Sequence, residues 1–217
     1  MIKPVQWKTF PRDFAIIQIG FALFGLAISM MIRGNLGTSA WVVLEAALAY
    51  KLGITVGAMT VIMGFIVLIS AVAMRERLGW GTLANILSIG PWIDLWNLFI
   101  PPVTENLWLQ LAMLLAAIVL MGLGSAIYIG VDAGAGPRDS LMLAIKRTTG
   151  VSIRVSRAMI EITVVFIGWL LDGPVGVGTV IYALLIGPSV QWGFKVFNVR
   201  PHRELEEVQA GIEGGAE

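Results

Sequence analysis

Two charged side chains inside an apolar run are the residues of this sequence best placed to do chemistry. Arg157 and Glu161 are four residues apart, so they share one face of a helix. Glu161 lies about nine residues, or roughly 13 Å, into the run that follows Ser152. An ionisable group at that depth in a bilayer costs at least ~2.5 kcal/mol, so it is expected to face the interior with a partner, here Arg157. The pair predicts substrate binding or proton coupling at Glu161, and the alternative is a structural ion pair that joins two helices.

Two short apolar stretches begin with residues that start helices. Gly136-Pro137-Arg138-Asp139 places a proline in the first turn and an aspartate beside the positive end of the helix dipole. Gly37-Thr38-Ser39 has the same character. If these N-termini lie inside the membrane, their free N–H groups can bind an anion, and Arg138 strengthens one of them. The alternative is a pair of surface helices with ordinary caps. Glu45, within the first stretch, is expected to be solvated.

One segment occurs twice in the sequence. Gly79-Trp80-Gly81-Thr82 leads to Gly90-Pro91, and Gly176-Val177-Gly178-Thr179 leads to Gly187-Pro188, at an offset of 187 − 90 = 97 residues. A proline inside a helix frees the carbonyl four residues before it, and in lipid that carbonyl must find another partner. The paired kinks therefore predict a lined central cavity. Asn85 and Tyr182, which also lie 97 residues apart, are polar residues at corresponding positions beside the kinks and are predicted to line it. The alternative is a pair of bends tolerated beside closely packed glycines.

The composition identifies the class of protein that must position these residues. Hydrophobic residues make up 57% of the 217 and charged residues 13%, whereas a soluble domain carries about 25% charged residues. With a mean hydropathy of +0.84, the chain is predicted to be an integral membrane protein. It has no Cys, and its single His, His202, lies in a charged tail, so no metal, cofactor or catalytic residue is predicted. A net charge of +1 gives no indication of nucleic-acid binding.

The predicted fold is an all-α membrane bundle of about six transmembrane helices plus two short half-helices. A helix of ~13 residues reaches only about 20 Å, less than the ~30 Å hydrocarbon core. With the N-terminus inside, 15 − 2 = 13 of the 15 basic residues fall on the inner side, which favours six spans over eight. The spanning runs are roughly 14–33, 55–74, 80–99, 108–130, 154–172 and 178–197, and the short runs are 38–50 and 137–147.

Three spans in each half would place the two copies in opposite orientations, which makes the repeat inverted. Gly25 and Gly37 align with Gly124 and Gly136 at an offset of 136 − 37 = 99, so the short helices are predicted to differ in length. The predicted boundaries are a cytoplasmic segment at 1–13, a first repeat at 14–99, a second repeat at 108–198 and a polar, disordered cytoplasmic tail at 199–217.

Several of these motifs together resemble the YczE/YitT-like family of bacterial membrane proteins. The resemblance is carried by Met121-Gly122-Leu123-Gly124, Gly134-Ala135-Gly136-Pro137-Arg138-Asp139-Ser140-Leu141-Met142, Arg157 with Glu161, and Gly176-Val177-Gly178-Thr179 with Ile186-Gly187-Pro188. It implies a multi-pass protein of the bacterial inner membrane and supplies neither a substrate nor catalytic residues. One departure is that the first half has no charged pair matching Arg138-Asp139.

The function these features favour is transport of a small solute across the bilayer. The predicted binding residues are Asn85, Arg138, Asp139, Arg157, Glu161 and Tyr182, beside the kink residues Gly90, Pro91, Gly187 and Pro188. The arginines favour an anionic or zwitterionic solute, and glycine-rich faces allow a homo-oligomer. The alternative function is a non-transporting accessory protein that binds a membrane partner, and an intramembrane enzyme is the least favoured.

Overall fold

The computed structural model of the chain consists of α-helices. It describes residues 7–74, 79–134 and 136–199, except the side chains of Asp139, Leu143, Ile153 and Arg154. The predicted N-terminal segment is therefore described only in part, and the predicted tail beyond Val199 lies outside the described residues. Within the described ranges there are eight helices and no strand, which confirms the all-α prediction.

The helices follow the apolar runs of the sequence closely. The side-chain oxygens of Thr55 and Ser152 each accept a hydrogen bond from the backbone N–H three residues on, so both residues are N-caps. The bounds are α1 Phe10–Gly34, α2 Ala40–Leu52, α3 Val56–Ala73, α4 Trp80–Phe99, α5 Leu107–Gly130, α6 Pro137–Thr149, α7 Ile153–Leu170 and α8 Val177–Val196.

Helices α2 and α6 are the two short ones, and they have the same length. Each has 13 residues, and α6 begins and ends 97 positions after α2. The prediction that they differ in length is therefore wrong. Gly37 corresponds to Gly134, not to Gly136, because these two glycines share the positive φ (115° and 123°) that a side chain would oppose. The segment Gly134-Ala135-Gly136 contains two glycines, and either of them can be aligned with Gly37 from the sequence alone.

In the described part of the chain, four helices are long and apolar enough to cross a membrane: α1, α3, α5 and α8. Helix α7 has 18 residues, as α3 does, but three of them are charged: Arg154, Arg157 and Glu161. Helix α4 carries Asn85, Asp94 and Asn97 among its apolar residues. Length and composition thus support an integral membrane protein, with four spans rather than six identified on these grounds alone.

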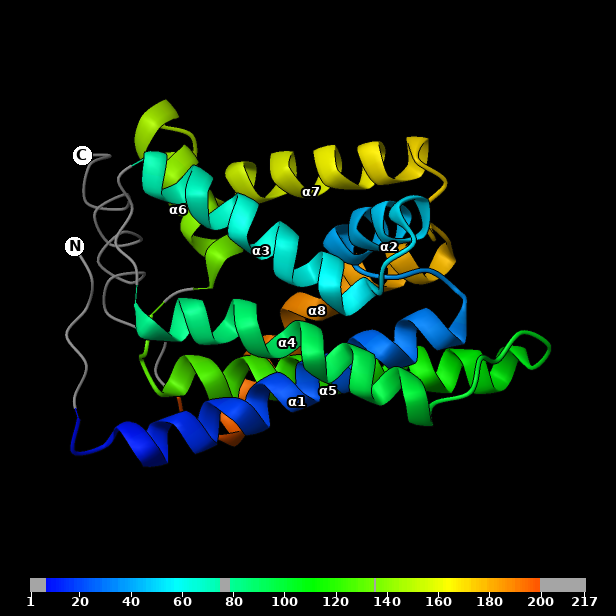
Figure 1. Cartoon of the computed structure of the whole chain (residues 1–217), viewed down its shortest axis with the longest axis horizontal. Helices are drawn as coiled ribbons and strands as arrows, with labels where there is room; N and C mark the ends of the chain where they lie inside the picture. Colours follow the sequence, from blue (N-terminus) through cyan, green and yellow to red (C-terminus); the bar gives the residue numbers. More distant parts are fainter. Residues whose placement is uncertain (1–6, 75–78, 135, 200–217) are drawn as a thin grey trace.

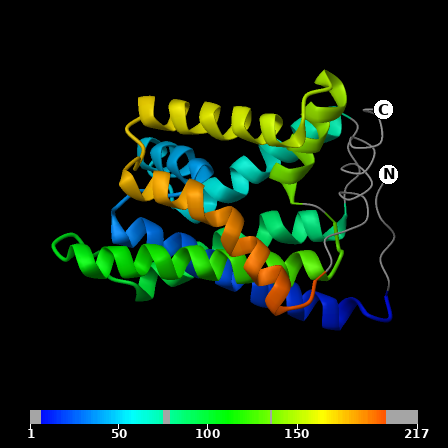
Figure 2. The ribbon, with the colours of Figure 1, turned by 180° about the vertical axis from the view of Figure 1, so that it is seen from behind.

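The helices form two groups that face each other. Figures 1 and 2 show α2, α3, α6 and α7 along one side of the molecule and α1, α4 and α5 along the other, with α8 running obliquely past α5. The main core lies between α1, α4 and α5, where Phe21, Ile93 and Leu114 are fully buried. Gly20 and Gly124 allow α1 and α5 to approach closely, because a Cβ on Gly20 would lie 3.1 Å from the Gly124 carbonyl oxygen.

Two reciprocal hydrogen bonds connect the halves. The Gly81 N–H donates to the Ala133 carbonyl (2.9 Å), and the Gly178 N–H donates to the Leu36 carbonyl (2.7 Å). Both donors and both acceptors are separated by 97 residues (178 − 81 and 133 − 36). The start of α4 is therefore held by the loop before α6, and the start of α8 by the loop before α2. These bonds fix the N-termini of both short helices inside the bundle.

The halves differ in how tightly their last two helices pack. Helix α3 packs along α4, and a Cβ on Gly57 or Gly90 would overlap the backbone of the other helix. Asp94 closes this contact by accepting hydrogen bonds from the Gly57 N–H (3.0 Å) and the Thr55 hydroxyl (2.6 Å). In the described part of the second half, α7 packs on α2 and α6 and barely touches α8, and the space around the Cα of Gly187 is open.

We expect Asp94→Ala to lower the free energy of unfolding by about 2 kcal/mol, because hydrogen bonds to a charged group contribute about 1.5–3 kcal/mol and this site is only partly buried. Chemical unfolding of the purified protein in detergent measures the loss. Gln191→Ala is the matched control, since Gln191 lies 97 residues after Asp94 and is exposed. An equal effect of the two substitutions would contradict the role given to Asp94.

Candidate functional site

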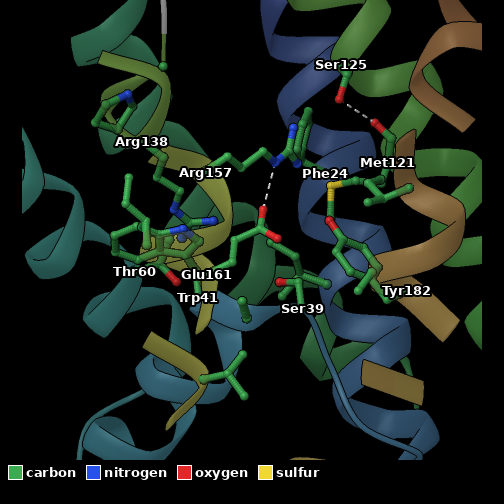
Figure 3. Close-up of a pocket in the computed structure, with 18 of the residues that line it drawn as sticks. Phe24, Ser39, Trp41, Thr60, Met121, Ser125, Arg138, Arg157, Glu161 and Tyr182 are labelled. Atoms are coloured by element: carbon green, nitrogen blue, oxygen red, sulfur yellow. Dashed lines mark hydrogen bonds and ion pairs between the residues drawn. The ribbon is translucent and has the colours of Figure 1, made fainter. Parts of the chain in front are cut away.

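A cavity of about 820 Å³ lies between the two groups of helices, and every helix contributes to its lining. Its volume is within the range of small-molecule binding sites, roughly 300–1,000 Å³. Most of the lining is apolar, as Phe24, Ile86 and Ile186 illustrate. Figure 3 shows the polar and charged groups that project into it, with the Arg157–Glu161 pair between Arg138 and Trp41 on one side and Tyr182 on the other.

The N-termini of both short helices reach this cavity. Ser39 and Trp41 line it at the start of α2, and Gly136 and Arg138 line it at the start of α6. Neither N-cap residue, Ser39 or Gly136, makes a side-chain capping hydrogen bond. The positive ends of two helix dipoles therefore converge on one space, which is the arrangement that favours a bound anion.

Arg138 and Trp41 occupy corresponding positions, 97 residues apart, and they contact each other across the cavity wall. The guanidinium carbon of Arg138 lies 4.9 Å from the centre of the Trp41 ring, a cation–π geometry. The guanidinium group of Arg138, which belongs to the second half of the chain, is thus held over the indole ring of a residue from the first half.

Glu45 is the residue that sequence reasoning misjudged. It was expected to be solvated, but its side chain is fully buried on α2. One carboxylate oxygen forms an ion pair with Arg138 on α6, and the other accepts a hydrogen bond from the Thr60 hydroxyl on α3 (2.8 Å). The expectation failed because α2 lies inside the bundle. An ionisable side chain in an apolar helix is expected to face the interior and to have a partner. This criterion was used for Glu161, and applied to Glu45 it predicts the burial that the structure shows.

Arg157 and Glu161 form the predicted pair, with 2.8 Å between Nε and Oε1. The pair lies along one face of α7 and lines the cavity (Figure 3). The side chain of Arg157 remains 56% exposed. It is therefore accessible to a ligand in the cavity.

The charges that line the cavity are unequal. Among the described lining residues, Arg138 and Arg157 carry positive charge, and Glu161 alone carries negative charge. Glu45 is behind Arg138 and does not line the cavity. Because each arginine is paired with one carboxylate, the unbalanced positive potential in the cavity comes from the two helix N-termini, beside which the guanidinium groups can donate hydrogen bonds. This favours an acidic group on the ligand.

The remaining predicted residues divide into two sets. Asn85 and Tyr182 line the cavity from α4 and α8, whereas the side chain of Asp139 lies outside the described residues. The four kink residues, Gly90, Pro91, Gly187 and Pro188, are absent from the described lining. Both prolines are exposed on the outer surface, and α8 bends along its length (Figure 2).

Among the described residues, no three acidic, histidine or cysteine side chains lie close enough together to hold a metal ion.

The comparisons with known proteins identify relatives along nearly the whole chain. The profile of a family described as "Family of unknown function (DUF6198)" matches residues 11–195. A Haemophilus influenzae protein named "Uncharacterized protein" is 31% identical over 201 residues, which is 93% of this chain and 92% of the relative. The "Uncharacterized membrane protein YczE" of Bacillus subtilis is 34% identical over 170 residues, 77% of this chain and 79% of YczE. The "Uncharacterized protein YyaS" of the same organism is 36% identical over 176 residues, 78% of this chain and 86% of YyaS. No solved structure matches the chain.

Proposed function

The chain belongs to the DUF6198 family, with the resemblance to YczE confirmed, and from that premise we propose that it transports a small anionic or zwitterionic solute. The observation that carries the proposal is the cavity on which both short-helix N-termini converge beside Arg138 and Arg157. Short or broken helices whose N-termini point at a central anionic group are a recurrent construction of secondary transporters.

The proposed topology has six spans and two half-helices, with the second half inverted relative to the first in the bacterial inner membrane. Three observations support it. All helix starts repeat at the offset of 97 residues, and the Gly81 and Gly178 hydrogen bonds are reciprocal. Helix α1 begins and α8 ends at the same end of the molecule, whereas α2 and α6 lie toward opposite ends (Figure 1). The positive-inside rule then places both termini in the cytoplasm.

The unequal packing of the halves supports a gating role for α3, α4, α7 and α8. The α3–α4 contact is closed by Gly57 and Gly90, and α7 is separated from α8. In the proposed cycle, one half moves relative to the other around the fixed cavity, so that each side opens in turn.

We expect a solute identified by a thermal-shift screen of small acids to bind at least tenfold more weakly to Arg157→Gln. The loss follows because hydrogen bonds to a charged group contribute about 1.5–3 kcal/mol, and the guanidinium group of Arg157 lines the cavity. Isothermal titration gives the affinity, and uptake into proteoliposomes gives the flux. Lys51→Ala, an exposed cation outside the cavity, is the control. Absence of flux together with a stable co-purifying protein would instead support the accessory function.

A further inference from the structure

The cavity wall formed by α7 changes character along its length. Arg157 and Glu161 line it in the first half of the helix, and Val165, Phe166 and Trp169 line it in the second half. From Glu161 to Trp169 the helix advances eight residues, or about 12 Å. The site is therefore charged at one end and apolar along a stretch long enough for a hydrocarbon chain.

The apolar stretch borders the separation between α7 and α8. Tyr182, Ala183 and Ile186 line the cavity from α8, and the described parts of α7 and α8 barely touch. In the first half, the corresponding contact of α3 with α4 depends on Gly57. The residue 97 positions later is Arg154, so the second half lacks the glycine that permits such close packing. The sequence thus keeps α7 from closing on α8 as tightly as α3 closes on α4.

We propose that the cavity binds an amphiphile that has an acidic head group and a hydrocarbon chain. The head group lies at Arg138 and Arg157 beside the short-helix N-termini, and the chain lies along α7 in the separation between α7 and α8. This inference rests on the proposed function, because it names the class of solute for the same cavity.

The exposure of the large side chains along α7 supports this occupant. Ile162, Phe166 and Trp169 line the cavity, yet 70%, 55% and 58% of their surfaces are exposed. A small hydrophilic anion would occupy only the charged end and leave the apolar stretch of the cavity unfilled. A hydrocarbon chain covers them, and each methylene taken from water into an apolar environment raises affinity about fourfold.

The test is a binding series of n-alkyl phosphates, from ethyl to dodecyl, on the full-length protein in maltoside micelles. Tryptophan fluorescence or thermal shift gives the dissociation constants. We expect the ratio of the Trp169→Ala constant to the wild-type constant to be near one for ethyl phosphate and to rise to tenfold or more for decyl phosphate. Because both proteins share the same micelles, partitioning of the ligand cancels in this ratio. Phe166→Ala is a second variant if Trp169→Ala does not fold.

Two controls separate the head group from the chain. Arg157→Gln is expected to weaken binding about equally at every chain length, since it changes only the charged end. Trp108→Ala removes an 82% exposed tryptophan outside the cavity and is expected to change nothing. A wild-type affinity that does not depend on chain length, or a Trp169→Ala ratio that stays at one, would overturn the inference.

Two parallel experiments distinguish whether the amphiphile comes from solution or from the bilayer. In one arm, decyl phosphate is added from water, and in the other, diacyl phosphatidic acid is supplied in nanodiscs, with native mass spectrometry reporting what is bound. Binding in the first arm identifies single-chain amphiphiles from solution, binding in the second identifies bilayer lipids, and binding in neither overturns the inference. Binding that depends on alkyl-chain length, without flux, would contradict the proposed transport function and leave this inference intact. Flux of short hydrophilic anions, with binding that does not depend on chain length, would support transport and overturn this inference.

Discussion

Replacing Glu45 with alanine is expected to lower the free energy of unfolding by about 3 kcal/mol. Glu45 is completely buried and connects three helices, because it pairs with Arg138 on α6 and accepts a hydrogen bond from Thr60 on α3. Breaking a buried ion pair by removing one partner typically costs about 3–5 kcal/mol, since the other charge is left uncompensated. The lower value applies here because Arg138 is partly exposed to the cavity. Equilibrium unfolding in mixed micelles measures the change.

Two comparisons decide whether the burial of Glu45 causes this loss. Glu161→Ala also removes the carboxylate of an arginine pair, but that pair is partly exposed, so its loss is expected to be at most about 1 kcal/mol. The double variant Glu45→Ala/Arg138→Ala is expected to be more stable than the sum of the two single changes predicts, because neither charge then remains unpaired. Equal, small effects of Glu45→Ala and Glu161→Ala would show that Glu45 is not buried in an ion pair.

The helices could be predicted because each depends on local signals. Apolar runs predicted the positions of the helices, and the N-caps Thr55 and Ser152 are residue types that typically begin helices. The Arg157–Glu161 pair was predictable for the same reason, since both residues are on one helix and four positions apart. Local spacing is sufficient for such features.

The environment of α2 could not be predicted in the same way. A stretch of 13 residues is too short to span a bilayer, so the sequence left open whether α2 lies at the surface or inside. The answer depends on contacts distant in sequence, such as that between Leu36 and Gly178. Glu45 was misjudged because its burial depends on Arg138, 93 residues away. The separation of α7 from α8 was not predicted either. Arg154 stands where the first half has Gly57, but the importance of that glycine depends on its contact with Gly90 on another helix.

The two halves share one helical plan but have different polar residues at corresponding positions. Trp41 and Arg138 correspond, as do Thr60 and Arg157, and in each pair both members line the cavity. The second half supplies the arginines and the first half supplies an aromatic ring and a hydroxyl group. A ligand placed between them therefore meets positive charge mainly from the second half, so its acidic group is expected to be oriented toward α6 and α7.

Gly90→Ala and Gly187→Ala are expected to have very different effects, although the two glycines lie at corresponding positions. A Cβ on Gly90 would overlap the carbonyl oxygen of Gly57, so α3 and α4 would have to separate. Overpacking of this kind typically costs about 1–3 kcal/mol, and the upper value applies because the obstacle is rigid backbone. A Cβ on Gly187 has no atom of another segment within 4 Å, so Gly187→Ala is expected to stay within about 1 kcal/mol of wild type.

The pair is a closely matched comparison because each glycine precedes a proline inside a helix. Any local strain from adding a Cβ before Pro91 or Pro188 is common to both variants and cancels in the difference. The difference in free energy of unfolding, measured in one detergent, therefore reports the tertiary contact alone. If the two substitutions were equally harmful, α7 would have to pack on α8 as α3 packs on α4. The separation in which we place the hydrocarbon chain would then not exist.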